Sequence, residues 1–207
     1  MARPRLIDDE ELLVSLRESF LKLGPAASTQ ELAARAGVSE GTLFKRFESK
    51  HRMFALAMRL PPLEGPWIDE MLDRAGTGSL GDHLRDVASG LVSHLEELFP
   101  RLMCALGRPL APEDLRLIMG DDEAPPILML RRITRMFEIE IAAGRVRPLP
   151  ARHLAELFLG AVQHHVHRVA IFGERAAVEP DLQTFARELA ATVESLVSIV
   201  PPPQPSH

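Results

Sequence analysis

The stretch STQELAARAGVSEGTLFKRFESK, residues 28–50, contains two short helical patterns separated by a glycine. Ser28 precedes Glu31 by three positions, which is the spacing of a capping box at a helix start. This helix is expected to end at Gly37, and Ser39 can cap the next one. Helices of about eight residues are marginal alone, so both need tertiary packing. The pattern therefore predicts a helix-turn-helix, whose second helix can enter the major groove of DNA.

The outward side of this motif carries side chains suited to DNA. Cations and helix N-termini, here those after Ser28 and Ser49, bind phosphates, whereas short polar residues at the start of the second helix can reach base edges. The residues that face base edges and phosphates are Ser39, Glu40, Gly41 and Thr42, and the cationic ones are Lys45, Arg46 and Lys50.

Composition limits the alternatives. The chain has 207 residues, 46% of them hydrophobic, and a single cysteine, Cys104. One thiol excludes an internal disulfide framework, and we interpret it as a small core residue, with a thiol sensor as the alternative. No apolar run approaches a membrane span and no signal-type segment opens the chain, so we expect a cytoplasmic protein without a membrane partner. The net charge is −5, yet residues 1–60 hold 10 Lys and Arg against 8 Asp and Glu.

The remaining pattern is helical, without period-two alternation or a hairpin signal, and it predicts an all-α fold. An N-terminal three-helix helix-turn-helix domain is expected at residues 1–60, a helical effector-binding and dimerisation domain at 61–200, and a disordered tail at 201–207. Beyond the motif, apolar spacing predicts helices at 6–23, from about 49 until Pro61-Pro62, at 79–99, 113–119, 127–142, 151–172 and 181–199.

Residues 6–60 resemble the DNA-binding domain of the TetR family of one-component transcriptional regulators. The resemblance lies in TQELAARAGVSEGTLFKRFESK, residues 29–50. It implies DNA-facing positions for Thr29, Gln30, Ser39, Glu40, Gly41, Thr42, Phe44, Lys45 and Lys50. The family usually has tyrosine where Phe44 stands, and its hydroxyl commonly reaches a phosphate. Phe44 can offer only apolar contacts to a sugar or a thymine methyl.

For residues 61–207 the resemblance implies an inducer-binding region and a homodimer held by the last two long helices. Apolar stripes on those helices fit this, although they could instead close the monomer's own core. We favour the dimer because two copies of a small DNA-binding domain, related by a two-fold axis, bind DNA more tightly than one. The candidate interface residues are Leu154, Phe158, Ala161, His165, Leu182, Phe185, Leu189, Val193 and Leu196.

An effector pocket is expected between helices, for a small apolar or amphipathic molecule. Its candidate walls, each of which could equally be ordinary core, are Trp67, Met71, Leu91, His94, Leu98, Met103, Ile133, Met136, Phe137 and His164. In the cluster His164, His165 and His167, only the first and third share a helix face, and no ligand completes a zinc set. We therefore expect no metal and no cofactor.

Together these features predict a transcriptional regulator rather than an enzyme, since phosphate-binding glycine loops, nucleophile elbows and HExxH motifs are absent from the sequence. The resemblance implies a repressor that an effector releases from a palindromic operator in double-stranded DNA. The alternative is a DNA-binding architectural or interaction protein that senses no ligand.

Overall fold

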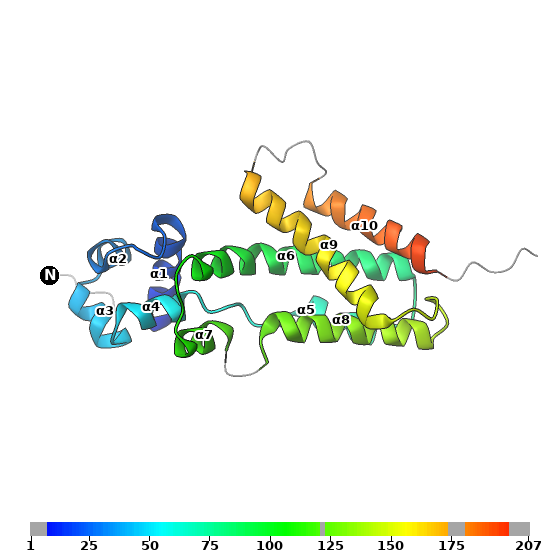
Figure 1. Cartoon of the computed structure of the whole chain (residues 1–207), viewed down its shortest axis with the longest axis horizontal. Coiled ribbons are helices and arrows are strands. Elements are labelled where there is room, and N and C mark those ends of the chain that lie inside the picture. Colours follow the sequence, from blue (N-terminus) through cyan, green and yellow to red (C-terminus); the bar gives the residue numbers. More distant parts are fainter. Residues whose placement is uncertain (1–7, 121–122, 174–180, 199–207) are drawn as a thin grey trace, which may run out of the picture. The chain divides into compact units, whose positions relative to one another are not determined.

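The structure, a computed structural model, describes residues 8–120, 123–173 and 181–198. Within these ranges every regular element is a helix, apart from an isolated antiparallel bridge between Val146 and Ser198. This confirms the predicted all-α fold class. In chain order the described helices are α1 (Asp9–Leu23), α2 (Thr29–Ala36), α3 (Glu40–Phe47), α4 (Lys50–Ala57), α5 (Pro66–Asp73), α6 (Leu80–Leu106), α7 (Pro112–Met119), α8 (Pro125–Ala142), α9 (Ala151–Phe172) and α10 (Leu182–Val197) (Figure 1).

The chain divides into two compact units. Unit 1 comprises Met1–Pro61 and Glu97–Ala124, and unit 2 comprises Pro62–Glu96 and Pro125–His207. The expected boundary after residue 60 lies one residue before the end of the first segment of unit 1. Unit 1 also includes the end of α6 and all of α7, because apolar side chains of these helices join its core. The predicted tail, residues 201–207, lies outside the described residues.

The core of unit 1 explains why four short helices are stable together. Leu12 and Leu16 of α1 are fully buried, and so are Leu32 of α2 and Leu43 of α3. Phe20 of α1 meets Phe54 of α4 edge to face, with ring centroids 5.0 Å apart. The remaining large members of this core are Phe47, Met53, Met58, Leu60, Leu98 and Ile118.

Helix α6 continues beyond the end that its sequence pattern predicts. The pattern ends at residue 99, before Pro100, yet the helix runs to Leu106 with Pro100 inside it. A proline within a helix costs about 3 kcal/mol because it removes a hydrogen bond and crowds the preceding turn. The later part of α6 places Leu98 and Ala105 in the core of unit 1, and this burial offsets the cost.

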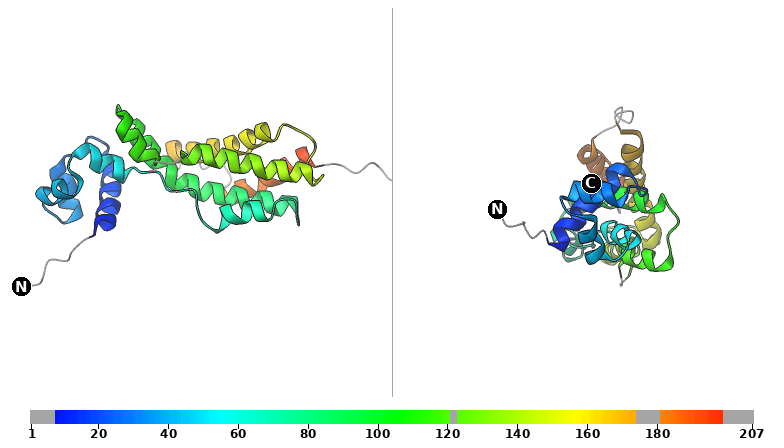
Figure 2. Two further views of the ribbon diagram at one scale, coloured as in Figure 1. Left: turned by 90° about the horizontal axis from the view of Figure 1, so that it is seen from below. Right: turned by 90° about the vertical axis from the view of Figure 1, so that its left-hand side faces the viewer.

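In unit 2, α9 packs along α8 and also contacts α10, while α5 packs on α8 (Figures 1 and 2). The sequence pattern assigns no element to the segment that forms α5. This helix buries Ile68 and Met71, and its Trp67 lies against Gly90 of α6. A Cβ atom added to Gly90 would overlap the indole of Trp67, so only glycine leaves room for this ring.

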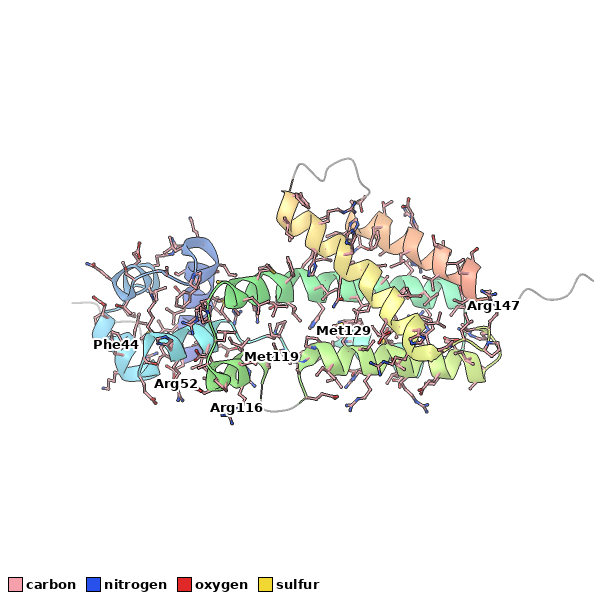
Figure 3. The ribbon with its side chains drawn as sticks, viewed as in Figure 1. Phe44, Arg52, Arg116, Met119, Met129 and Arg147 are labelled. Carbon is pink, nitrogen blue, oxygen red and sulfur yellow. The ribbon has the colours of Figure 1, made fainter. Side chains whose placement is uncertain are left out.

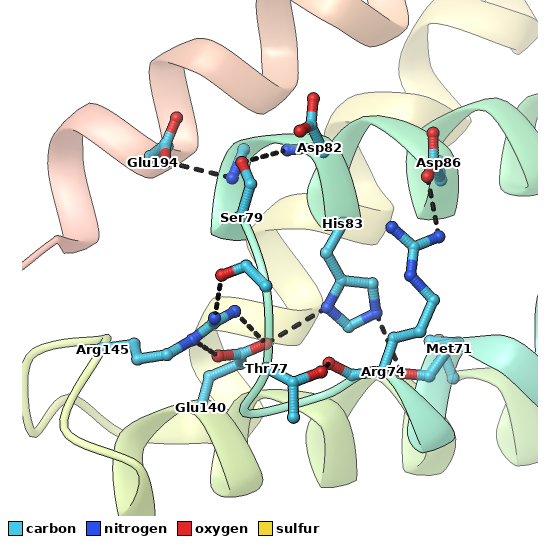
Figure 4. Close-up of polar contacts among 12 residues, drawn as sticks. Met71, Arg74, Thr77, Ser79, Asp82, His83, Asp86, Glu140, Arg145 and Glu194 are labelled. Atoms are coloured by element: carbon cyan, nitrogen blue, oxygen red, sulfur yellow. Dashed lines mark hydrogen bonds and ion pairs between the residues drawn. The ribbon is translucent and has the colours of Figure 1, made fainter.

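A buried ionic network connects four segments of unit 2 (Figure 4). His83 Nδ1 lies 3.1 Å from Glu140 Oε1, and His83 Nε2 lies 2.9 Å from the carbonyl oxygen of Met71. Arg145 Nε donates to Glu140 Oε2 at 2.6 Å, and the same guanidinium donates to the Gly78 carbonyl. Burial alone would raise the pKa of Glu140, but the hydrogen bonds from His83 and Arg145 outweigh it and lower this pKa to about 2.

Among the described residues, no helix combines the length and the apolar character needed to cross a membrane. The other predicted helices agree with the structure within about two residues wherever their ends lie among the described residues, with one exception. Helix α4 ends at Ala57, before the Pro61-Pro62 pair that was expected to stop it. Short helix α7 also lies where a helical stretch is predicted within the proline-rich connection.

Candidate nucleic-acid interface

The turn between α2 and α3 is built around Gly37. This residue has φ 67° and ψ 26°, the left-handed conformation that glycine adopts without steric cost. The Val38 N–H donates to the Ala33 carbonyl at 3.1 Å and closes the end of α2. Ser39 then caps α3 through its side chain, which accepts from the Thr42 N–H at 3.1 Å. The chain therefore changes direction between α2 and α3 within three residues, as a helix-turn-helix requires.

The two helices are oriented by small and apolar side chains. Ala33 and Ala36 of α2 are buried and lack bulk, so α2 can approach its neighbours closely. Leu43 and Phe47 of α3 point into the core, whereas Val38 is only half-buried. This packing leaves the opposite side of α3 on the surface.

All eleven predicted DNA-binding residues lie on the surface of unit 1. Phe44 exposes 42% of its area on α3 (Figure 3). The exposed members are Ser28, Gln30, Ser39, Glu40, Gly41, Phe44 and Lys45, and the half-buried ones are Thr29, Thr42, Arg46 and Lys50. The structure thus brings together the whole set on α2, α3 and the start of α4.

A hydrogen bond joins the first residues of the two helices. Thr29 Oγ1 donates to Glu40 Oε2 at 2.5 Å. Sequence spacing did not predict this contact, because it depends on the angle at which α2 and α3 cross. A threonine and a glutamate that both follow a serine cap were its only sequence signal.

A second cluster of polar side chains, Ser28, Glu31 and Lys50, lies at the N-terminus of α2. Ser28 and Glu31 form the predicted capping box, in which the Ser28 N–H donates to Glu31 Oε2 at 2.8 Å. Hydrogen bonds from Ser28 lower the pKa of Glu31, and the charge of Lys50 contributes. Lys50 Nζ donates to the Ala26 carbonyl at 3.2 Å, which places this ammonium beside the start of α2. A helix N-terminus next to a lysine is suited to a phosphate.

Arg46 has a structural contact as well. Its Nη1 lies 3.0 Å from Asp9 Oδ1, so it ties α3 to the start of α1. Lys45 is exposed and therefore stands free to approach a backbone phosphate without first breaking a buried contact.

The predicted pocket residues do not form one group. Eight of them belong to unit 2, whereas Leu98 lies in the core of unit 1 and Met103 is 47% exposed there. The sequence pattern does not show this division, because the single helix α6 belongs partly to each unit. Those in unit 2 that are fully or nearly fully buried are Met71, Leu91, His94, Ile133, Met136 and Phe137. Trp67 is half-buried and His164 is exposed.

The predicted interface residues also separate into two kinds. Phe158 meets Phe137 edge to face at 6.1 Å, and His165 stacks on Phe185 at 3.9 Å. Phe158 and His165 are each 1% exposed, so contacts within unit 2 already cover them. Periodicity could not tell which flank of the α9 stripe faces the monomer's own core. The half-buried members are Leu154, Ala161, Leu182, Phe185, Leu189 and Val193, and Leu196 is exposed.

A different flank of α9 is apolar and open. Leu157 exposes 72% of its area, Ile171 exposes 61% and Phe172 exposes 57%. The spacing of Leu157, His164 and Ile171 is seven residues, which a helical projection would have placed on one face. In the described part of the chain, no group of three or more His, Cys, Asp and Glu side chains could hold a metal ion.

Comparisons with known proteins agree with this geometry. The model of the family described as bacterial regulatory proteins, tetR family, matches residues 12–57, which span most of α1 to α4. No curated protein matches the chain.

Solved structures match nearly the whole length. NalD of Pseudomonas aeruginosa, the secondary repressor of the MexAB-OprM multidrug efflux pump, is 20% identical, with 91% of this chain and 94% of that chain covered and a TM-score of 0.62. PfmR, a regulator from Thermus thermophilus, is 19% identical, with coverage of 89% and 97% and a TM-score of 0.61. SmeT in complex with triclosan is 19% identical, with coverage of 96% and 97% and a TM-score of 0.60. At these identities the likeness concerns the fold.

Proposed function

Because this chain belongs to the TetR family of bacterial regulatory proteins, and so is a DNA-binding regulator, we propose that it is a repressor that binds a palindromic operator as a homodimer and leaves it when an effector binds. The observation that carries the proposal is the exposed, serine-capped pair α2 and α3, whose polar residues gather on one surface.

The DNA-binding surface of unit 1 makes two kinds of contact. Helix α3 enters the major groove and presents Glu40 and Thr42 from its first turn to base edges. The capped start of α2 and the ammonium of Lys50 bind the backbone beside the groove, since N–H groups and cations attract phosphate. Lys45 adds a second cation on the exposed side of α3.

The homodimer forms through the open faces of α9 and α10. Leu157 of α9 and Leu196 of α10 expose 72% and 60% of their areas, and Ile171 and Phe172 of α9 are also largely exposed. Several exposed apolar side chains on two helices are typical of a surface that a partner covers. The half-buried Leu189 and Val193 lie on the same helix as Leu196 and extend this surface. A two-fold axis then places two copies of α3 at half-sites about 34–36 Å apart, one turn of DNA.

The effector binds in unit 2. The apolar residues that line α5, α6 and α8 there include several methionines, whose flexible side chains can repack around a guest. The complex of SmeT with triclosan supports an effector for this chain, because SmeT shares the fold and binds triclosan.

Selection of DNA fragments by the pure protein tests the DNA-binding proposal. We expect a short palindrome preferred by about 10³ or more over random DNA, whereas an architectural binder would show no such ratio. Lys50→Ala should weaken binding to every sequence and reduce the salt slope by about one unit per half-site. Lys22→Ala, at the exposed end of α1, is the matched control and should leave the slope unchanged.

Sedimentation tests the homodimer. Leu157→Glu combined with Leu196→Glu places charges on the proposed interface, and we expect monomers at micromolar concentration. Leu115→Glu, an exposed leucine of α7 in unit 1, should remain dimeric. A folded double variant that still sediments as a dimer would exclude this surface.

A metabolite screen tests the effector proposal. Trp67 is the sole tryptophan, so its fluorescence reports on a molecule bound near α5. Coupling is reciprocal, and an effector that weakens operator binding must itself bind less tightly when operator is present. A broad screen that changes neither thermal stability nor operator affinity would favour the regulator that senses no ligand.

A further inference from the structure

The contact between Thr29 and Glu40 assigns a task to each of these residues. Thr29 is the first residue of α2 and Glu40 is the first residue of α3, and the hydrogen bond between them spans the motif at 2.5 Å. It joins two side chains on the surface that the proposed function places against DNA.

Neither residue is needed to cap its own helix. The side chain of Ser28 caps α2, and the side chain of Ser39 caps α3 by accepting from the Thr42 N–H. A carboxylate at a helix start favours the helix dipole in any orientation, whereas this one is turned toward α2. The dipole therefore does not explain the orientation of Glu40.

The proton of the threonine hydroxyl decides what each group can still do. A hydroxyl has one hydrogen, and Thr29 gives it to Glu40. While this bond exists, Thr29 cannot donate to a phosphate. The carboxylate has a second oxygen, Oε1, and within the described residues no hydrogen bond or ion pair engages it.

We propose that Glu40 selects cytosine in the operator and that Thr29 is the positioning residue that holds its carboxylate for this contact. This inference rests on the proposed function and deepens it. A carboxylate only accepts hydrogen bonds, and in the major groove cytosine presents the N4 amine as a donor. Guanine and thymine present acceptors to the same groove and repel it, while adenine places the N7 acceptor beside its N6 amine.

The bond from Thr29 matters because glutamate is flexible. A free glutamate side chain loses rotamer entropy when it is held, and the phosphates around the groove repel it. A hydroxyl that already holds Oε2 fixes the orientation before DNA arrives.

Selection from a randomised palindrome library tests both assignments with matched variants. Glu40→Ala should lower the preference for cytosine at one symmetric pair of positions by roughly 5- to 150-fold. Glu40→Gln should shift that preference toward adenine, because an amide can both accept from N6 and donate to N7.

Thr29→Val keeps the shape of threonine and removes the hydroxyl. It should lower the cytosine preference at the same two positions, by roughly threefold or more, while Thr29→Ser should retain it. Lys22→Ala, at the exposed end of α1 and outside the predicted DNA-binding set, is the control and should leave this preference unchanged. Circular dichroism and thermal unfolding of each variant confirm that the helices are intact.

The outcomes distinguish the roles of Glu40 and Thr29 from the proposed regulator function. If wild type selects a palindrome and Thr29→Val weakens all sequences equally, then Thr29 binds phosphate and the positioning role is overturned. If wild type selects a palindrome and Glu40→Ala changes no base preference, the cytosine assignment is overturned while the regulator proposal stands. If wild type selects no sequence, both fall together.

Discussion

The two units use polar side chains in opposite ways. In unit 1 the contacts on the surface that we propose binds DNA are exposed and close in sequence: Thr29 and Glu40 are 11 positions apart. In unit 2, His83 and Glu140 are 57 positions apart, and their side chains are 2% and 0% exposed. Exposed polar groups stay available to a ligand and cost little when changed, whereas buried ones hold segments together and are costly to remove.

The largest effect is expected at the centre of the buried network. Glu140→Ala leaves the buried ring of His83 and the guanidinium of Arg145 without their carboxylate, so the free energy of unfolding should fall by about 3–5 kcal/mol. Glu138→Ala, which removes only the surface pair with Arg135, should cost less than about 1 kcal/mol. Urea unfolding at one fixed protein concentration measures both, and equal losses would contradict the contrast between buried and exposed polar groups.

The same network should make stability depend on acid. The pKa of Glu140 is about 2 in the folded chain against 4.5 for the free group, so its contribution is fully present above pH 4.5 and is lost as the pH falls toward 2. The difference corresponds to about 3 kcal/mol. We expect the stability gap between wild type and Glu140→Gln to shrink as unfolding is measured from neutral pH down to about pH 3. A gap that stays constant would show that this carboxylate is not held by its two partners.

A smaller effect is expected where α5 meets α6. Gly90→Ala forces Trp67 to move, which should cost about 1–3 kcal/mol and change the tryptophan emission spectrum. Gly41→Ala is the matched helical glycine in unit 1, where the nearest atom to an added Cβ is Ser39 Oγ at 3.8 Å. That variant should gain about 0.5–1 kcal/mol from improved helix propensity. Thermal unfolding and fluorescence distinguish the two glycine variants. An unchanged emission spectrum for Gly90→Ala would show that the indole of Trp67 does not lie against Gly90.

The smallest change is expected at the exposed ring of Phe44. Phe44→Tyr adds a hydroxyl to a side chain that is 42% exposed, so stability should change by less than about 0.5 kcal/mol. The hydroxyl can donate to a phosphate, and binding to every sequence should improve by about 0.5–1.5 kcal/mol. Competition binding with selected and random DNA measures this, and a gain confined to one sequence would mean that the ring reads a base.

How well a feature could be predicted from the sequence depends on how far apart along the chain its interacting residues lie. Caps such as Ser28 and Glu31, and the turn glycine Gly37, lie within a few positions of their partners, so they were recognised and are confirmed by the structure. Helix α5 was missed because its stability comes from Gly90 and His83, which lie on a later helix. The two flanks of α9 were not separated because only tertiary packing decides that Phe158 is covered while Leu157 is open.

The sequence by itself determined the all-α class and the positions of most helices, because caps, glycine conformations and apolar spacing act within one or two turns. Only the tertiary structure decided that α6 serves two cores, that Thr29 holds Glu40, and that Glu140 is buried between His83 and Arg145. Each of these depends on the angle at which separate helices cross, and that angle is set by many side chains packing together rather than by a local pattern.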